Sequence, residues 1–435
     1  MCIRDSPYTL DAPLVLQSAS TMSIQDGVSL RASEGVTITV NGVFDAGAAT
    51  ISSTGYGARW GGLMLGPSVA ASIELSGTQL LESAPALTVS GLGSVRADGV
   101  FMARSSSDPL GLVESGNAAE LVVRNSHLQN GSGCAHLYPS SATIEFTNVS
   151  FADCEEQGVW AQQVPVEFND LTFGAGMDWG MELTGVSGTV NGVNATQYDG
   201  EGAIVALNSQ PSGFTLTDVV GRVTGQAGVA GENNLDITLE RIDLEGAPGI
   251  DVDRTSGTFS DITLRGDGTG IGFISHHGRS FDGLVVDGLD VSGYSVGVSL
   301  HSDPGEISAP LILRNARVVV SSALATEHYP VRLESTELIG SLDVAFTTVS
   351  SVDGQVGTVS VGESGEYAAY RTVVLDARRG GLPVPASFTV AYGNELLAPF
   401  TVEGTTVDVE LLLRTVNEAG EAVASQWTVE AVVSG

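Results

Sequence analysis

The chain has 435 residues, of which 51 are Asp or Glu and 18 are Lys or Arg, so its net charge is −33. So negative a chain repels nucleic-acid phosphates and acidic lipid surfaces, and it has no apolar stretch long enough to span a bilayer. All 18 basic residues are Arg, which excludes a catalytic lysine or a lysine Schiff base in this sequence.

The first six residues look foreign to the rest of the chain. Met1–Ser6 resembles the translation of a transposon end that was ligated to DNA during library preparation, so we expect residues 1–6 to be an artefact. The native N-terminus is then missing, and the far end is expected to be cut shortly after the strand-like segment 427–433. Residues 7–71 are expected to hold an N-terminal cap and the first coils of a repeat.

A phrase of about 22 residues recurs from roughly Ser72 to Arg332. Each copy has an alternating apolar segment, a polar bend, a glycine followed by a short apolar run, and another bend. The glycines that mark the copies are Gly158, Gly180, Gly202, Gly228, Gly249, Gly270 and Gly297. Repetition at this period is typical of stacked coils, each of which buries its apolar face against its neighbours. The marker glycines are expected to supply corners with positive φ.

Two architectures fit the apolar spacing. A leucine-rich repeat would fit Ile242 and Leu244, but it needs Asn or Cys just after the strand, where Glu245 and Gly246 stand. Val, Ile, Thr and Phe share the inward sites with Leu, as strands prefer, and no window has a sustained helical period. The sequence therefore predicts an all-β parallel β-helix over residues 72–340, with leucine-rich repeats or tandem sandwiches as alternatives.

The repeats resemble the right-handed parallel β-helix proteins, the pectin-lyase-like architecture of polysaccharide lyases, polygalacturonases and many surface adhesins. The segment from Gly55 to Leu65 resembles the W-G-G-I phrase that often opens the helix in prokaryotic surface proteins. The resemblance covers residues 14–332 and depends on periodicity. Stacking of such coils predicts ladders of inward residues along the axis, here Ile250, Val252, Ile271, Phe273, Val298 and Leu300.

The repeat stops near residue 340. Residues 341–365 are turn-rich and are expected to form a linker or the last coil. Longer strands with hairpin-type turns follow, which predicts a small β-sandwich over residues 366–435. The stretch 373–390 resembles the first hairpin of carboxypeptidase-regulatory-like and Ig-like modules, which serve as stalks and spacers. Such a module would also cover the open end of a β-helix.

Cys134 and Cys154 are 20 residues apart, in neighbouring coils where stacking can bring them together. Counting from the local glycine places them in different parts of the turn, so a disulfide and two buried free thiols both stay open. A zinc site is not expected, because no paired His or C-x-x-C spacing accompanies them. Three N-x-[ST] sequons are candidate glycosylation sites of a secreted protein, at Asn130, Asn148 and Asn194.

Outward residues on one wall of the coils are the candidate site. With the glycines as a ruler, one outward position holds Trp160, Glu182, Ile204, Ala230, Asp251, Gly272 and Ser299, and the next holds Gln162, Thr184, Ala206, Glu232, Asp253, Ile274 and His301. The catalytic candidates are Asp251, Asp253 and His301, because paired carboxylates act as acid and base or hold Ca²⁺ against a uronate. The ligand-binding candidates are Trp160, Glu182, Asp251 and Asp253, with Trp179 nearby. A solvated face of an acidic protein is the alternative.

Enzyme motifs give little support. The polygalacturonase motifs N-T-D, D-D, G-H-G and R-I-K are not intact. Residues 276–279, with the sequence His-His-Gly-Arg, are the segment most similar to G-H-G. As a base for pectate-lyase-type chemistry, Arg254, Arg265 and Arg279 are candidates by residue type alone. The sequence predicts a secreted or cell-surface structural or adhesive protein of a marine or salt-adapted prokaryote. Its partner would be an extracellular glycan or surface protein, and Ca²⁺ would bind along carboxylate rows; a polysaccharide lyase or glycoside hydrolase is the alternative.

Overall fold

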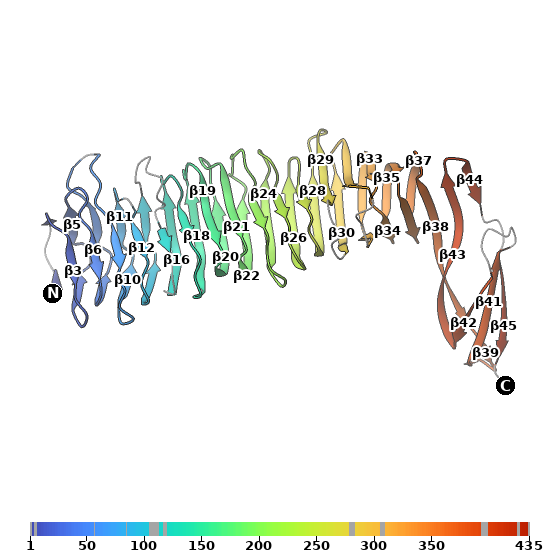
Figure 1. Cartoon of the computed structure of the whole chain (residues 1–435), viewed down its shortest axis with the longest axis horizontal. Helices are drawn as coiled ribbons and strands as arrows, with labels where there is room; N and C mark the ends of the chain where they lie inside the picture. Colours follow the sequence, from blue (N-terminus) through green and yellow to red (C-terminus); the bar gives the residue numbers. More distant parts are fainter. Residues whose placement is uncertain are drawn as a thin grey trace. The chain divides into compact units, whose positions relative to one another are not determined.

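The computed structural model describes residues 2–3, 7–55, 57–83, 85–103, 113–115, 120–277, 283–304, 309–392, 399–423 and 427–433. Across these ranges the chain is all-β, and it forms the predicted parallel β-solenoid, with about 13 turns (Figure 1). No helix that could cross a membrane occurs in this part of the chain. Contacts divide the chain into two compact units, residues 1–258 with 262–267 (unit 1) and residues 259–261 with 268–435 (unit 2). The predicted domain boundaries stay a prediction.

The first turns of unit 1 contain three short strands each. Every strand pairs in parallel with the strand three places further along the chain, so that β4 pairs with β7 and β7 with β10. The strands of these turns are β1 (Cys2–Ile3), β2 (Tyr8–Leu10), β3 (Leu14–Leu16), β4 (Thr21–Ile24), β5 (Ser29–Ala32), β6 (Ile38–Val40), β7 (Val43–Ala46), β8 (Thr50–Ser53), β9 (Leu63–Leu65), β10 (Ser72–Ser76), β11 (Gln79–Leu81), β12 (Leu87–Val89), β13 (Ser94–Asp98), β14 (Phe101–Ala103) and β15 (Val113–Ser115).

Later turns of unit 1 contain one long and one short strand, because β16 pairs with both β13 and β14. The long strands are β16 (Glu120–Gln129), β18 (Ile144–Ala152), β20 (Pro165–Phe173), β22 (Ser187–Ala195), β24 (Thr215–Arg222), β26 (Ile237–Glu245) and β28 (Gly257–Arg265), and residues 259–261 of β28 are counted with unit 2. The short strands are β17 (Ala135–Leu137), β19 (Gln157–Gln162), β21 (Trp179–Thr184), β23 (Val205–Asn208), β25 (Val229–Glu232) and β27 (Ile250–Asp253).

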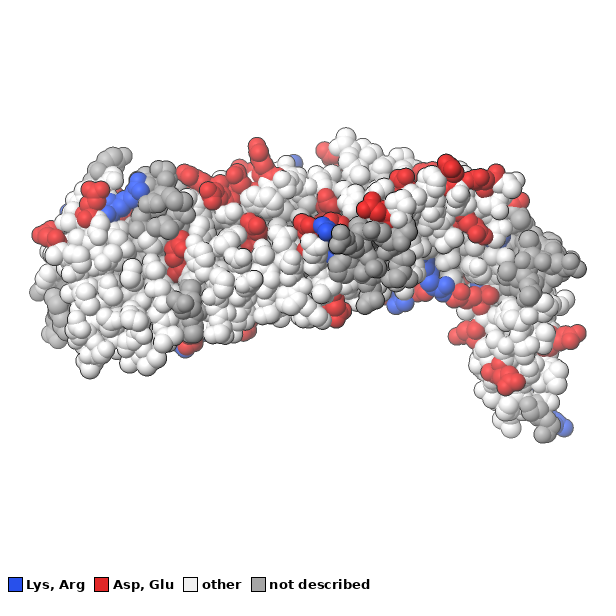
Figure 2. Space-filling model, in the orientation of Figure 1, with Lys and Arg blue, Asp and Glu red and all other residues white. Residues whose placement is uncertain are grey.

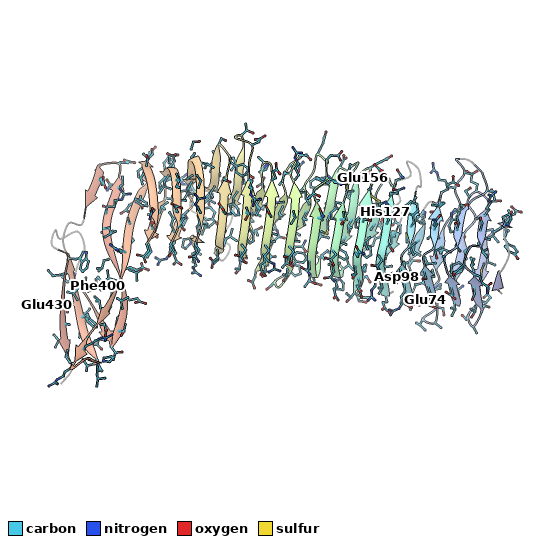
Figure 3. The ribbon with its side chains drawn as sticks, turned by 180° about the vertical axis from the view of Figure 1, so that it is seen from behind. Glu74, Asp98, His127, Glu156, Phe400 and Glu430 are labelled. Atoms are coloured by element: carbon cyan, nitrogen blue, oxygen red, sulfur yellow. A yellow bond between two sulfur atoms is a disulfide. The ribbon has the colours of Figure 1, made fainter. Side chains whose placement is uncertain are left out.

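Each long strand turns a corner at a residue with positive φ. This residue is Asn125 in β16, Asn148 in β18 and Asp170 in β20, with φ between 48° and 55°. Asn and Asp tolerate this conformation better than other residues with a side chain. Their side chains also connect the turns: Asn148 Nδ2 donates to Asn125 Oδ1 at 2.9 Å, and Asn125 Nδ2 donates to Asp98 Oδ1 at 2.8 Å (Asp98 is labelled in Figure 3).

The marker glycines have a different role from the one expected. Only Gly270 of the seven has a positive φ, at 70°, so the predicted left-handed corner is wrong for the other six. Close packing explains five of these six, all except Gly249. A Cβ on Gly158 would lie 2.7 Å from the carbonyl oxygen of Gly180, and a Cβ on Gly228 would lie 2.4 Å from a methyl carbon of Leu244. A side chain at these positions would collide with the next coil or with the core.

Inward apolar residues stack in ladders, as predicted. The rings of Phe146 and Phe168 lie 5.1 Å apart between their centroids, and those of Phe151 and Phe173 lie 5.2 Å apart. Among the six residues proposed for the ladders, those at most 2% exposed are Ile250, Val252, Phe273, Val298 and Leu300. Ile271 is the exception: it is half-buried, as is Val296, the residue that pairs with it in the next turn.

Cys134 and Cys154 form a disulfide, with their Cα atoms 5.5 Å apart, and both side chains are fully buried. The free-thiol alternative is therefore excluded. The two residues do occupy different parts of the turn, since Cys134 precedes β17 and Cys154 follows β18. Closing a loop with 20 residues of sequence separation restricts the unfolded chain, which stabilises the fold by about 3 kcal/mol.

Unit 2 repeats the parallel pattern and then changes to antiparallel pairing. Its parallel strands are β29 (Ile271–His277), β30 (Leu284–Ser292), β31 (Val296–Ser302), β32 (Leu311–Arg314), β33 (Arg317–Glu327), β34 (Val331–Glu334), β35 (Glu337–Ala345), β36 (Thr348–Val352) and β37 (Gln355–Val361). They are followed by β38 (Glu366–Asp376), β39 (Arg378–Arg379), β40 (Leu382–Pro383), β41 (Ala386–Tyr392), β42 (Phe400–Gly404), β43 (Thr406–Asn417), β44 (Gly420–Val423) and β45 (Trp427–Val433).

Strand β38 connects the two pairing patterns, because it is parallel to β36 and antiparallel to β43. Strand β41 lies between β42 and β45 in a small antiparallel sheet. Phe388, Val390 and Leu411 are at the centre of the core that these strands enclose. The arrangement is consistent with a small sandwich-like domain, whereas the Ig-like resemblance stays a prediction.

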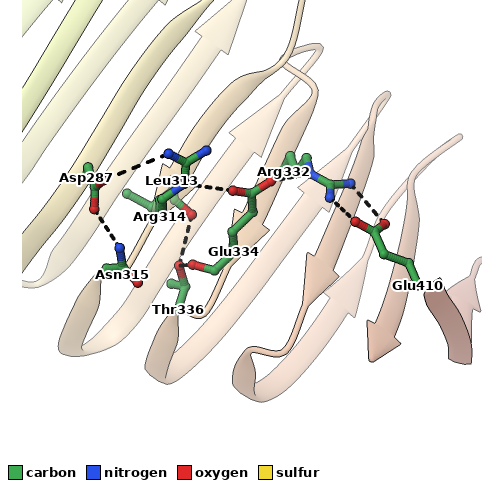
Figure 4. A network of polar contacts seen from close by, with 8 residues as sticks. All are labelled: Asp287, Leu313, Arg314, Asn315, Arg332, Glu334, Thr336 and Glu410. Atoms are coloured by element: carbon green, nitrogen blue, oxygen red, sulfur yellow. Dashed lines mark hydrogen bonds and ion pairs between the residues drawn. The ribbon is translucent and has the colours of Figure 1, made fainter. Parts of the chain in front are cut away.

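A polar network ties β43 to the last parallel strands of unit 2 (Figure 4). The Glu334 carboxylate accepts hydrogen bonds from Arg332 at 2.7 Å and from Arg314 at 2.8 Å, which hold the pKa of Glu334 below its ordinary value. Arg332 also pairs with Glu410 of β43. Partly exposed ion pairs of this kind contribute little to the free energy of folding.

Candidate functional site

One column of outward-facing residues crosses the short strands of unit 1. Main-chain register aligns its members from turn to turn, and we call it the outer column: Glu114, His136, Trp160, Glu182, Ala206, Ala230 and Asp251. A second column lies two residues further along each strand and holds Gln162, Thr184, Asn208, Glu232 and Asp253. The structure thus places Trp160, Glu182 and Asp251 in one column, as predicted.

The register corrects the glycine-based alignment in the turn that contains β23. Met181 pairs with Val205 and Glu182 with Ala206, so Ala206 takes the place that had been assigned to Ile204. Ile204 is fully buried instead. In this turn the residue equivalent to Gly180 is Ile204 and not a glycine. Gly202 lies two residues earlier, so counting from it shifts the alignment by two residues.

The alignment is also wrong by two residues within unit 2. Ser299 pairs with Ile274, whereas the glycine spacing predicts Gly272. His301 pairs with His276, whereas the glycine spacing predicts Ile274. Gly272 is therefore the equivalent of Gly297, and a Cβ on Gly272 would lie 2.9 Å from the carbonyl oxygen of Gly297. Gly270, the marker glycine of this turn, lies two residues before Gly272.

His301 lies in unit 2, on β31, whereas Asp251 and Asp253 lie in unit 1, on β27. A wall shared by all three stays a prediction. The imidazole Nδ1 of His301 lies 3.3 Å from Glu327 Oε2 on the next strand. Both border a hollow of about 320 Å³ that is also lined by Asp343, on the surface of unit 2.

The arginines proposed as bases are paired with acids where the structure describes them. Arg254 contacts Glu232 and Asp253, and Arg265 contacts Asp243. Arg279, Gly278 and the side chain of His277 lie outside the described residues, so the similarity to G-H-G is not tested.

A hollow of about 260 Å³ opens on the outer face of β21, β23, β25 and β27. We call it the β21–β27 groove. Its lining consists of Trp179, Glu182, Ala206, Asn208, Ala230, Gly231, Glu232, Asp251 and Asp253. In the outer column, Ala206 and Ala230 lie between Glu182 and Asp251. Their side chains are smaller than those on either side, and this difference in size makes the hollow. The groove brings together three of the four predicted ligand-binding residues.

Trp179 forms one wall of the groove. Its half-buried ring packs against a cluster of small residues, Ala203, Ala206 and Ala227, on the outside of the coil. Gly202 makes room for this packing, because a Cβ there would lie 2.5 Å from the indole. One part of the ring therefore covers the coil, and the other part faces the groove.

The groove is acidic, and its carboxylates differ in environment. Burial raises the pKa of Glu182 above its ordinary value, and a hydrogen bond from Gln157 at 3.5 Å opposes this effect. Arg254 lies 2.6 Å from a carboxylate oxygen of Glu232 and 3.0 Å from one of Asp253, so it neutralises part of the charge at that end. Four carboxylates with one arginine leave a net negative site.

The outer column also contains a buried polar pair that the sequence did not reveal. His136 Nδ1 lies 3.3 Å from Glu114 Oε1, and the two side chains are 9% and 10% exposed. The rings of His136 and Tyr138 meet Trp160 edge-on, at centroid distances of 5.9 and 5.4 Å. Strand alternation in Ala135–Leu137 does place His136 outward, but the register was needed to find Glu114 and Trp160 beside it.

Two further predictions from the sequence concern cation binding and glycosylation. Among the residues it describes, no group of three or more His, Cys, Asp or Glu side chains is placed to hold a metal ion. Ca²⁺ binding stays a prediction. The sequon residues Asn130, Asn148 and Asn194 are exposed, and Asn194 Oδ1 accepts a hydrogen bond from the Thr196 hydroxyl at 2.9 Å. Their glycosylation stays a prediction as well.

The chain matches no protein-family model, no curated protein and no solved structure. The parallel β-solenoid is therefore shown by the structure itself, while the pectin-lyase-like resemblance stays a prediction.

Proposed function

We propose that this is an extracellular structural or adhesive protein that binds a glycan in the β21–β27 groove. The observation that carries the proposal is the meeting of the Trp179 ring, the apolar floor of Ala206 and Ala230, and several carboxylates in one hollow. A sugar ring has an apolar face of C–H groups and a rim of hydroxyls. An aromatic ring and Ala methyl groups suit the face, and carboxylates accept hydrogen bonds from the hydroxyls.

The charge of the groove favours a neutral glycan. Glu182, Glu232, Asp251 and Asp253 face the ligand with Arg254 as the nearest cation, and the whole chain carries a charge of −33. In Figure 2 the visible face likewise carries many Asp and Glu side chains and few Arg. A uronate chain would be repelled, unless a divalent cation bridged its carboxylates to those of the protein.

Affinity electrophoresis tests the proposal. The protein would be run through gels that contain xylan, glucomannan or alginate, with and without Ca²⁺. We expect retardation by a neutral polysaccharide, and we expect Trp179→Ala to weaken it about tenfold or more, as when an aromatic anchor is truncated. Trp427→Ala is the matched control, because Trp427 is 38% exposed on β45 and outside the groove. Equal retardation of the wild type and Trp179→Ala would contradict the proposal.

Glycan cleavage is the second candidate, and the spacing of the carboxylates limits how it would work. Glu182 and Asp251 are three strand spacings apart, about 14 Å, which is too far for an acid–base pair on one glycosidic bond. Asp251 and Asp253 are two residues apart on β27, so their Cα atoms are about 7 Å apart, a main-chain spacing compatible with the carboxyl separation of inverting hydrolases. These two residues are therefore the pair to test.

The binding proposal predicts no turnover. Reducing ends and unsaturated products would be followed during incubation with the same three polysaccharides, for the wild type and for the Asp251→Asn, Asp253→Asn double variant. We expect both proteins to remain at the level of the buffer blank. Turnover by the wild type that disappears in the double variant would make the protein an enzyme.

A further inference from the structure

Trp160 lies beside the groove but is not part of its lining. It pairs in register with Glu182, so it precedes the groove by one strand in the outer column. Its ring is half-buried, and the neighbouring Tyr138 is 38% exposed. The two rings therefore present an aromatic surface that adjoins the end of the groove formed by Glu182.

The polar pair behind this surface is costly to bury. Glu114 and His136 are both about nine-tenths buried on the outside of the coil, where apolar residues of similar size would give at least equal stability. Burial together with the charge of Glu114 also raises the pKa of the Tyr138 hydroxyl, so the carboxylate acts on Tyr138 as well as on His136. The ring of His136 contacts Trp160 and the carboxylate of Glu114 interacts with Tyr138, so this buried pair is connected to both rings of the surface and holds them in place.

We propose that Trp160 and Tyr138, held in place by the buried Glu114–His136 pair, form a second sugar contact, so that the site takes a linear neutral polysaccharide chain and not a single sugar. This inference rests on the proposed function and specifies its ligand. Trp160 and Tyr138 would touch the sugar, whereas Glu114 and His136 are positioning residues.

The length of the outer column supports a chain of several sugars. From Trp160 to Asp251 the register crosses four strand spacings, about 19 Å. One sugar ring is much shorter than this, while an oligosaccharide lying along the column would reach both Trp160 and the floor of the groove. A short oligosaccharide in the groove would leave Trp160 uncovered.

Titration calorimetry with xylo-, manno- and cello-oligosaccharides of increasing length tests the inference. We expect the affinity to rise with length until the chain reaches Trp160. Trp160→Ala should remove this gain, about tenfold for the longest oligosaccharide, and leave the affinity for the shortest one that binds unchanged. Trp160→Met fills the same space without a ring and gives the same test if the Ala variant unfolds.

The positioning role has its own readout. His136→Gln should reproduce the length-selective loss of Trp160→Ala although His136 is buried, whereas Glu114→Gln, which keeps an acceptor for the imidazole, should retain most of the gain. Affinity that does not depend on length, or an equal loss at all lengths in Trp160→Ala, would overturn the inference and leave the proposed function standing. Absence of binding to every oligosaccharide and polysaccharide would overturn both.

Discussion

Replacement of Asn234 by Leu is expected to lower the free energy of unfolding by about 2–6 kcal/mol. Asn234 is fully buried and completes a polar ladder between turns. Its side chain accepts a hydrogen bond from the Gln210 backbone N–H at 2.9 Å and donates one to the Leu207 carbonyl at 2.9 Å. Leu has a similar size but leaves both buried main-chain groups without these bonds, at about 1–3 kcal/mol each.

The loss should be local at first, because each coil of a solenoid contacts only its neighbours. Urea unfolding followed by circular dichroism would measure the overall loss, and hydrogen exchange at the Gln210 amide would show where the fold opens. Asn169→Leu, at a half-exposed outward position on β20, is the control and should change stability by less than about 0.5 kcal/mol. Equal midpoints for the Asn234 and Asn169 variants would mean that the ladder does not stabilise the coil.

Phe168→Ala should cost about 3–5 kcal/mol. The Phe168 side chain is fully buried, its ring lies 5.1 Å from that of Phe146 in the turn before, and the register pairs it with Val190 in the turn after. Removal of the ring leaves a cavity between three coils, and the main-chain ladders on both sides prevent these coils from closing over it.

Guanidinium unfolding would measure this effect, with Phe168→Leu as the graded control. Leu fills part of the space, so it should cost less than half as much as Ala. The double variant with Phe146→Ala should cost less than the sum of the two single variants, because both rings border the same cavity. A Phe168→Ala midpoint equal to that of the wild type would show that the coils can collapse over the lost ring.

The sequence predicted the stacking of coils well but aligned them imperfectly. Apolar pairs such as Val149/Phe151 and Leu171/Phe173 keep their place from turn to turn, and the register aligns them as the repeat suggests. The glycines were a poorer ruler, because Gly is favoured wherever coils pack closely and is not tied to one position in the turn. Gly202 and Gly270 therefore shifted the predicted alignment by two residues in their turns.

The candidate site shows the same limit. Glu182, Asp251 and Asp253 were proposed from outward alternation, and they do lie in one groove. The hollow between them was not predicted, because it depends on which small residues stand opposite each other in consecutive turns. The alignment by glycines is shifted by two residues in this turn, so it predicts Ile204 at the position where Ala206 forms the floor of the groove.

The sequence by itself determined the all-β solenoid and the inward and outward faces of its strands. Its apolar residues recur every two residues within a strand and about every 22 residues from coil to coil, and both periods can be read without a structure. Only the tertiary structure decided the Cys134–Cys154 disulfide, the Glu114–His136 pair and the floor of the groove. Each of these depends on contacts between residues of different turns. Loop lengths between the turns vary, so the register that brings such residues together is set by main-chain pairing and core packing, which local sequence does not encode.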